Sequence, residues 1–210
     1  MSEPVTRAGD DAVAGDDTAA DDAVAGDDTA ADDAVAGDVA AAGREEFPRP
    51  PVAFTDGEGR SVSVRGLVDD DRSALVTLYD AFDPADRAQG LPPRTTAGVE
   101  SWLADICEVG VHSAAWHDDR AVGHACLVPT RDARHELAIF VASAYQHAGI
   151  GTRLLRTLLG QGAAHGAERV WLVVSPRNTV ARRLYESAGF DRTADRDGPN
   201  ATDIEMERRL

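Results

Sequence analysis

From residue 61 onward, the spacing of apolar residues switches between strand-like and helix-like periods. Val62 and Val64 alternate with polar neighbours and predict a first strand. Apolar side chains then recur at helical spacing over about 69–83, and again over a stretch that Thr95 or Thr96 would cap. Two apolar runs, 111–116 and 121–128, flank a polar turn and predict a strand hairpin.

The second half of the chain continues with strands followed by helices. A strand beginning at His135 leads through a glycine-containing turn into a helix with leucines on one face. A buried strand from Arg169 to Val174 comes next, followed by a short helix around 180–188. Two weaker strands are expected near Phe190 and Ile204. This order of elements predicts an α/β fold built on a mixed sheet.

The N-terminal segment follows a different pattern, an 11-residue repeat of the form DDAVAGDDTAA over residues 10–41. Each copy has one or two valines and several alanines against three or four aspartates, too little apolar surface to offset an ordering cost of about 1–2 kcal/mol per residue. We expect residues 1–43 to be a disordered acidic tail, with docking on a basic partner as the alternative. Residues 44–60, rich in proline and glycine, are interpreted as a linker, or as an irregular approach, to a domain at 61–210.

Charge and composition exclude several classes of function. All 21 basic residues are arginine, so a Schiff-base lysine and a Walker lysine are excluded. Residues 44–210 hold 25 acids and 20 arginines, which argues against a nucleic-acid partner. No apolar run reaches the ~18 residues of a membrane helix. We expect a soluble, cytoplasmic protein, and the excess of 26 aspartates over 11 glutamates resembles proteins of salt-rich cytoplasm.

Neither the cysteines nor the histidines show the spacing of a metal site. Cys107 and Cys126 match no metal or redox motif and are interpreted as core residues. The remaining histidines are interpreted as surface or core residues, namely His112, His117, His124, His135 and His165. We therefore expect no metal.

The turn QHAGIG, residues 146–151, carries the most informative chemistry. A turn that opens a helix exposes free backbone amides, where the helix dipole also favours an anion. Leu154 stands where a dinucleotide fingerprint needs its third glycine, and a Walker loop would need lysine. Taken alone, the turn indicates either another phosphate ligand or a tight connection without one.

Two motifs in the same order resemble the GNAT N-acetyltransferase superfamily. Gln146, Gly149 and Gly151 match its pyrophosphate-binding signature of Gln or Arg, two residues, Gly, one residue, and Gly or Ala. The stretch VWLVVSPRNTVARRLYESAGF resembles the strand and helix that follow, with Asn178 and Tyr185 seven residues apart. The resemblance covers about 61–208. It implies a mixed, mostly antiparallel sheet of six to seven strands flanked by about four helices.

The resemblance also implies acetyl-CoA as the donor, with direct acetyl transfer to a primary amine in a ternary complex. It places the pantetheine arm beside the strand residues Ile139, Phe140 and Val141. The pyrophosphate would lie on the turn and helix start, which comprise Gln146, His147, Ala148, Gly149, Ile150, Gly151 and Thr152. A protonated His147 or Arg153 would supply the cationic help. Asn178 would be a further cofactor contact, and it fits equally well as a helix N-cap.

The resemblance assigns catalytic roles to two residues. At the glutamate on the strand, the resemblance is to the protein-lysine-acetylating branch of the family. An ammonium of pKa about 10.4 has no free electron pair, so a base must remove its proton. Glu136 has the position of that base, and its alternative role is a surface carboxylate at a strand end. Tyr185 would reprotonate the departing thiolate, or would simply pack in the core beside Leu184 and Ala188.

The sequence leaves the acceptor open between a small-molecule amine and a protein amine. The segment from Pro84 to Arg94 is expected to line the acceptor side of the site. Two other functions are weighed against the enzyme: a non-catalytic acyl-CoA binding module on the same fold, and an interaction protein acting through the acidic tail. The oligomeric state is also left open, a homodimer included.

Overall fold

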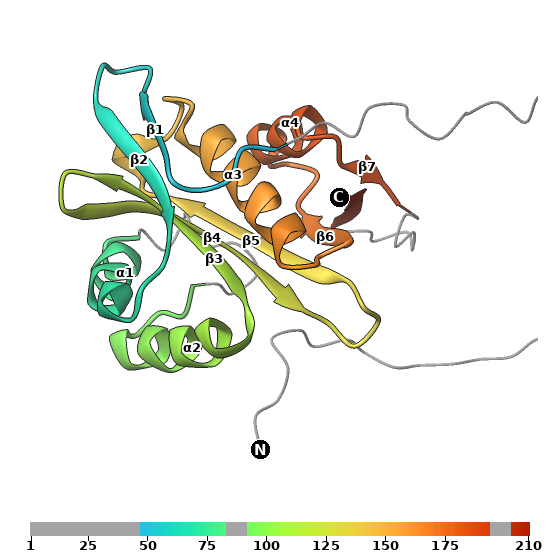
Figure 1. Ribbon diagram of the computed structural model, residues 1–210, viewed down its shortest axis with the longest axis horizontal. Helices are drawn as coiled ribbons and strands as arrows, with labels where there is room; N and C mark the ends of the chain where they lie inside the picture. The colour runs from blue at the N-terminus through green and yellow to red at the C-terminus, as the bar shows by residue number, and fades with distance from the viewer. Residues whose placement is uncertain (1–46, 83–91, 194–202) are drawn as a thin grey trace, which may run out of the picture. The chain divides into compact units, whose positions relative to one another are not determined.

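The computed structural model describes residues 47–82, 92–193 and 203–210. Contacts divide the chain into two units, 1–41 and 42–210, and every described residue belongs to the second unit. The expected disordered tail, residues 1–43, therefore lies outside the described residues. The second unit is built on one sheet with the strand order β1-β2-β3-β4-β5-β6-β8-β7 (Figure 1).

The sheet is mixed and mostly antiparallel, as expected, and β5–β6 is its parallel pair among the described strands. The strands are β1 Val52–Thr55, β2 Ser61–Gly66, β3 Val111–His117, β4 Arg120–Pro129, β5 His135–Val141, β6 Arg169–Val174, β7 Asp191–Arg192 and β8 Ile204–Arg209. The helices are α1 Arg72–Asp80, α2 Thr96–Val109, α3 Ile150–Ala164 and α4 Thr179–Ser187. The described sheet thus has eight strands where six to seven were expected.

The interpretation of residues 44–60 as a linker is wrong for their described part. Val52–Thr55 forms β1, which pairs antiparallel with β2 from Val52 opposite Val64 to Thr55 opposite Ser61. Phe47 is buried in the core. The strand escapes prediction because its four residues stand between prolines and glycines, which ordinarily mark breaks.

Local sequence chemistry explains where the helices begin. Thr95 caps α2, and its hydroxyl accepts a hydrogen bond from the Gly98 amide at 3.1 Å. The helix expected over 69–83 is shorter than predicted, because a 3-10 turn at Asp69–Asp71 precedes α1. The Asp71 carboxylate accepts from both the Val68 amide and the Arg65 guanidinium, which fixes this turn.

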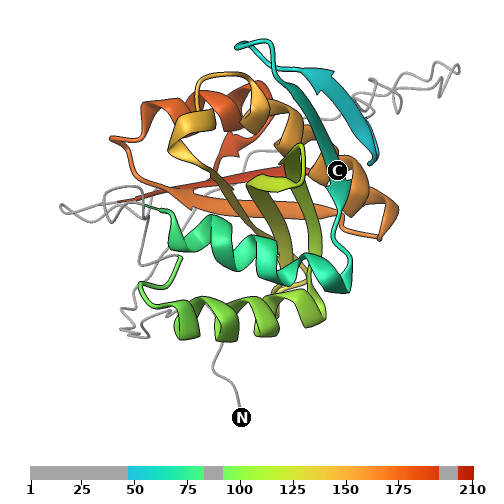
Figure 2. The ribbon, with the colours of Figure 1, turned by 90° about the vertical axis from the view of Figure 1, so that its left-hand side faces the viewer.

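The sheet separates two hydrophobic clusters. On one face, α3 buries its four leucines, which are Leu154, Leu155, Leu158 and Leu159. On the other face, α1 and α2 lie side by side (Figure 2) and bury Leu75, Tyr79 and Leu103 against Trp116. Each fully buried leucine contributes about 1.5–3 kcal/mol. Both faces of β5 are therefore covered, and its two sets of alternating side chains belong to different clusters.

Candidate functional site

The sheet opens between β5 and β6, which are paired only near their first residues. The register has His135 opposite Val170 and Glu136 opposite Trp171, and no further pair. On its other edge β5 remains paired with β4 as far as Val141 opposite Gly123. Within the described sheet, the second half of β5 therefore has one edge whose backbone groups bond to no neighbouring strand. Such an edge is able to bind an extended ligand through its main chain.

The turn after β5 has the geometry of an anion cradle. His147 has φ 60° and Gly149 has φ 84°, so the backbone twice enters the left-handed region before α3 begins. Gly149 is the N-cap of α3, no side chain caps the helix, and its first turn contains no acidic residue. The first amides of a helix have no partner within it. The amides at the start of α3 are thus available to an anion, and the helix dipole favours negative charge at this end.

The hairpin formed by β1 and β2 holds this turn in place. The Gly57 amide donates a hydrogen bond to the Ala148 carbonyl at 2.9 Å. Arg60 donates from Nη1 to the Ala144 carbonyl at 3.1 Å, and its guanidinium lies 4.3 Å from the centre of the Tyr145 ring. Asp56 fixes this arginine by accepting from its Nε at 2.7 Å. Sequence reasoning missed these residues because it placed the hairpin's first strand in a linker.

The predicted pyrophosphate residues differ in which of their atoms a ligand could reach. Gln146 is exposed, but its Nε2 donates to the Val141 carbonyl at 3.0 Å, so its side chain closes the turn onto the end of β5. Ala148 and Ile150 are buried and offer only backbone. The other exposed members of the set are His147, Gly149 and Thr152.

Three separate segments meet at Gly151. A Cβ at this position would lie 3.7 Å from Leu184 Cδ2 and 3.8 Å from Val141 Cγ2. The structure therefore brings together the end of β5, the start of α3 and the middle of α4. These are the segments that carry the two sequence motifs.

Asn178 and Tyr185 occupy the beginning and the middle of this last segment. The Asn178 Oδ1 accepts from the Ala181 amide at 3.0 Å, which confirms the N-cap role. Tyr185 is 8% exposed, and its ring centre lies 5.9 Å from that of Phe190. Burial raises the pKa of Tyr185 to about 12. The raised pKa keeps the hydroxyl protonated. Among the described residues, no hydrogen bond joins this hydroxyl to another group, so it is available to donate.

Glu136 lies on the opposite face of β5 from the residues that pack near Tyr185. Strand alternation puts Glu136 on the same face as Ala138 and Phe140, which pack against the α1–α2 cluster. Ile139 and Val141 pack against the cluster that contains Tyr185. The half-buried Glu136 stands where β5 and β6 still pair, at the closed end of the opening. The two predicted catalytic residues thus approach the opening from different faces of the sheet.

A buried chain of hydrogen bonds accounts for two of the histidines. Tyr79 Oη lies 2.5 Å from His124 Nδ1, His124 Nε2 lies 3.1 Å from His112 Nδ1, and His112 Nε2 lies 2.9 Å from the Ile106 carbonyl. A carbonyl only accepts, so each ring of a neutral chain donates through Nε2 and Tyr79 donates to His124. Burial lowers the pKa of both histidines. The expectation that these two are core residues is confirmed.

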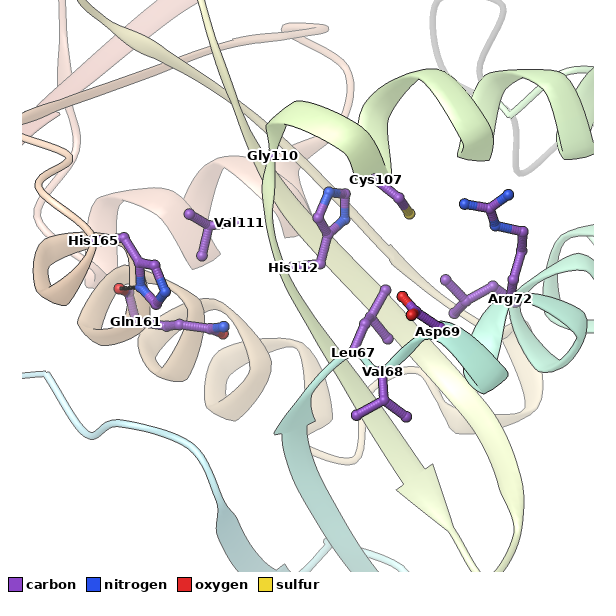
Figure 3. Close-up of a pocket in the computed structure, with 11 residues that line it drawn as sticks. Leu67, Val68, Asp69, Arg72, Cys107, Gly110, Val111, His112, Gln161 and His165 are labelled. Atoms are coloured by element: carbon purple, nitrogen blue, oxygen red, sulfur yellow. Dashed lines mark hydrogen bonds between the residues drawn. The ribbon is translucent and has the colours of Figure 1, made fainter.

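His112 also faces a pocket that is separate from the turn after β5. This cavity, of about 210 Å³, is lined by the start of α1, the end of α2 and the last turn of α3 (Figure 3). Cys107 lines it as a half-buried free thiol. Cys126 is a buried free thiol, and burial raises its pKa to about 12. No group of three potential metal ligands occurs in the ranges that the structure describes.

Comparison with known proteins identifies the class to which this fold and this turn belong. The family model described as Acetyltransferase (GNAT) family matches residues 75–190, more than half of the chain. The chain therefore belongs to the GNAT acetyltransferase family. This assignment confirms the resemblance drawn from the two sequence motifs.

Curated relatives match over shorter segments. An uncharacterized N-acetyltransferase of Mycobacterium bovis is 38% identical over 77 residues, which are 36% of this chain and 49% of that protein. The [ribosomal protein bS18]-alanine N-acetyltransferase of Haemophilus ducreyi is 41% identical over 51 residues, 24% of this chain and 35% of that protein. The chain thus spans about half, or less, of the length of these relatives.

Solved structures share the fold at low sequence identity. The GNAT domain of S. lividans PAT superposes with a TM-score of 0.64 at 18% identity, covering 76% of this chain and 97% of that one. The structure of yncA, a putative acetyltransferase from Salmonella typhimurium with its cofactor acetyl-CoA, has a TM-score of 0.58 at 18% identity, with coverages of 71% and 94%. Both neighbours support the same sheet and helix arrangement.

The segment from Pro84 to Arg94, expected to line the acceptor side, lies outside the described residues except for Pro92 to Arg94. Over the described ranges, none of the helices combines the length and the apolar character that crossing a bilayer requires.

Proposed function

We propose that this chain transfers an acetyl group from acetyl-CoA to a primary amine, directly and within a ternary complex. The observation that carries the proposal is the uncapped start of α3 beside the unpaired edge of β5. An anion site and a backbone edge lie next to each other there, and acetyl-CoA has a pyrophosphate joined to an amide-containing arm. Membership of the GNAT family supports the same chemistry.

The donor site proposed here uses backbone groups. The amides from Gly149 to Thr152 would hold the pyrophosphate, because the first turn of α3 contains no acidic residue and no side chain caps the helix. A Cβ at Gly149 would meet no atom within 4 Å, so the surface of the turn is open where a ligand would lie. Arg153 is exposed in the same turn of helix and adds a positive charge. The unpaired edge of β5 from Ile139 to Val141 would bind the amides of the pantetheine arm.

Glu136 acts as the base in this proposal. The half-buried carboxylate, at the closed end of the opening, would take the ammonium proton through a bridging water. An amide near Val141 would donate to the oxygen that becomes negative during transfer. The base and this amide belong to the same strand, so their spacing is fixed by β5 itself.

Tyr185 stabilises the departing sulfur. With a pKa of about 12, its hydroxyl is a weaker acid than a thiol of ordinary pKa near ~8.5. Its contribution is therefore a hydrogen bond donated to the sulfur as negative charge develops, and the departing thiolate takes its proton from solvent. The buried ring beside Phe190 holds the hydroxyl in one place.

Protein amines are the first acceptors to test. The name of the Haemophilus ducreyi relative states that it acetylates an alanine of ribosomal protein bS18. We propose a protein or peptide amine for this chain, with small-molecule amines as the comparison arm of the assay.

The test measures release of the CoA thiol, and mass of the acetylated product, with alanine-starting peptides, lysine peptides and a polyamine. Tyr185→Phe should lower turnover by roughly 10² to 10⁴ while acetyl-CoA binding persists. Tyr145→Phe is the matched control, since it removes a hydroxyl that bonds His117 at 2.9 Å and has no assigned role in transfer. Binding of acetyl-CoA without any acetylated product would establish the non-catalytic module instead.

A further inference from the structure

A second pocket lies at the far end of α3 from the turn that opens this helix. Its cavity volume is about 740 Å³. The walls come from the segment at Phe47, the last turns of α3, and the adjoining ends of β6 and β8. Because α3 has 15 residues at a rise of about 1.5 Å each, the pocket is roughly 20 Å from the proposed pyrophosphate site.

The pocket is strongly cationic in an acidic chain. Its charged side chains are one acid, Glu168, and four arginines, namely Arg49, Arg169, Arg208 and Arg209. The whole chain has a formal net charge of −16. Arg169 and Arg209 are also direct partners across β6 and β8, and like charges in that position destabilise a sheet. The pairing of these two strands therefore gives no reason for an arginine at position 209.

Two of these arginines have bonding partners within the protein. Arg169 donates a forked pair of hydrogen bonds to Glu207, at 2.9 and 3.1 Å. Arg208 donates to the Ala188 carbonyl, and its guanidinium lies 4.6 Å from the centre of the Phe47 ring. Both groups are fixed in direction and form a rigid part of the pocket.

The other two cations are available to a ligand. Arg49 and Arg209 are exposed, and neither makes an ion pair or a hydrogen bond through its side chain within the described part of the chain. Each guanidinium carries five donors in a planar fork that matches a carboxylate or a phosphate. The pocket thus offers two guanidinium groups that are available to bind anionic groups.

An apolar wall completes the pocket and is fixed by backbone packing. Phe47 is 8% exposed and lies beneath two guanidinium groups, those of Arg156 and Arg208. The main chain at Phe47 and Pro48 lies directly on Gly160 of α3, where a Cβ would come within 2.8 Å of the Phe47 carbonyl oxygen. Only glycine allows this approach, so the wall has a defined position. Pockets of a few hundred Å³ with an apolar wall and a few convergent polar groups are typical of small-molecule sites.

We propose that this pocket binds a small organic anion with at least two negative charges, as carboxylate or phosphate groups, on an apolar body. The charges would engage the guanidinium groups of Arg49 and Arg209. The apolar body would lie against the accessible part of the apolar lining, Ala163 and Leu210. The proposal is independent of the acetyl-transfer chemistry, because it shares no residue with the opening between β5 and β6.

The test is isothermal titration of the full chain with two probes, benzene-1,3,5-tricarboxylate and 1-naphthyl phosphate, in saturating CoA. The CoA blocks the turn before α3, which would otherwise bind phosphate. The variant is the double change Arg49→Glu and Arg209→Glu. The control is Arg120→Glu with Arg131→Glu, because these arginines are also exposed, have no side-chain partner in the described ranges, and give the same change in net charge.

We expect saturable binding of at least one probe, weakened tenfold or more by the pocket variant and unchanged by the control. Binding of only one probe identifies whether carboxylate or phosphate is the preferred group. The proposal is overturned if both double variants weaken binding equally, or if neither probe binds the unaltered protein at millimolar concentration.

Discussion

Replacing Gly151 with glutamate tests whether the start of α3 holds the pyrophosphate. The protein itself has room for the change, because a Cβ would lie 3.7 and 3.8 Å from its nearest neighbours, which is ordinary contact. Glycine within a helix is destabilising by roughly 0.5–1 kcal/mol relative to alanine, and an acid near a helix N-terminus contributes a further 0.3–1 kcal/mol or so. In the absence of ligand, the free energy of unfolding should therefore stay constant or rise.

Binding should change in the opposite direction. A carboxylate about 6 Å from a unit negative charge on the ligand is repelled by roughly 0.7–2.8 kcal/mol, for effective dielectric constants between about 80 and 20. Its bulk also blocks close approach of the pyrophosphate to the backbone amides. We expect the Kd of acetyl-CoA to rise tenfold or more, which corresponds to about 1.4 kcal/mol or above.

Calorimetric titration with acetyl-CoA and a thermal unfolding scan measure the two effects separately. Gly151→Gln is the matched control, because it adds the same bulk without the charge. The difference in affinity between the two variants should shrink as salt rises, since screening acts on the charge and not on the bulk. A folded Gly151→Glu protein with the affinity of the unaltered chain would remove this turn from the binding site.

Three further outcomes are expected. A chain starting at Arg44 should match the unfolding midpoint of the full chain at fixed salt, and a large drop would show that the acidic repeats pack. Burial lowers the folded pKa of His112 and His124 below the ordinary value near ~6.5, so the unfolded state binds more protons in acid. In urea unfolding, the free energy of unfolding should therefore reach its full value above about pH 6.5 and decrease below it. The control variant His165→Gln, at an exposed histidine, should keep this dependence. A free energy that does not change with pH would contradict the prediction. In the same assay, Gly160→Ala should lower the free energy of unfolding by about 1–3 kcal/mol, because the backbone at Phe47 blocks a Cβ. Gly151→Ala should not lower it.

Periodicity predicted most of the elements of the fold because each of them has a covered face. The leucine stripe of α3 and the capping threonine of α2 are local signals, and both are confirmed. Strand β1 was missed because its four residues gain their strand conformation from pairing with β2, not from their own spacing. Proline and glycine on either side then gave the stronger local signal.

The candidate site likewise has parts that the sequence predicts and parts that it does not. The turn at 146–151 was found because its glycines are adjacent in sequence to the helix they open. The support from Arg60 could not be predicted, since its hydrogen bond to Ala144 spans 84 residues and depends on the hairpin being folded. The chain from Tyr79 through His124 to His112 likewise joins residues 45 and 12 positions apart.

The opening between β5 and β6 has a consequence for how the protein behaves without its ligand. Half of β5 has the character of an edge strand although it lies in the interior of the sheet order. Exposed strand edges promote association with other chains, and ligand binding to the folded state raises apparent stability. A bound acyl-CoA would take the place of the missing neighbour, so purified protein should resist aggregation better when CoA is supplied. The same amides should become slow to exchange with solvent deuterium once the ligand is bound, which makes this strand a sensor of occupancy.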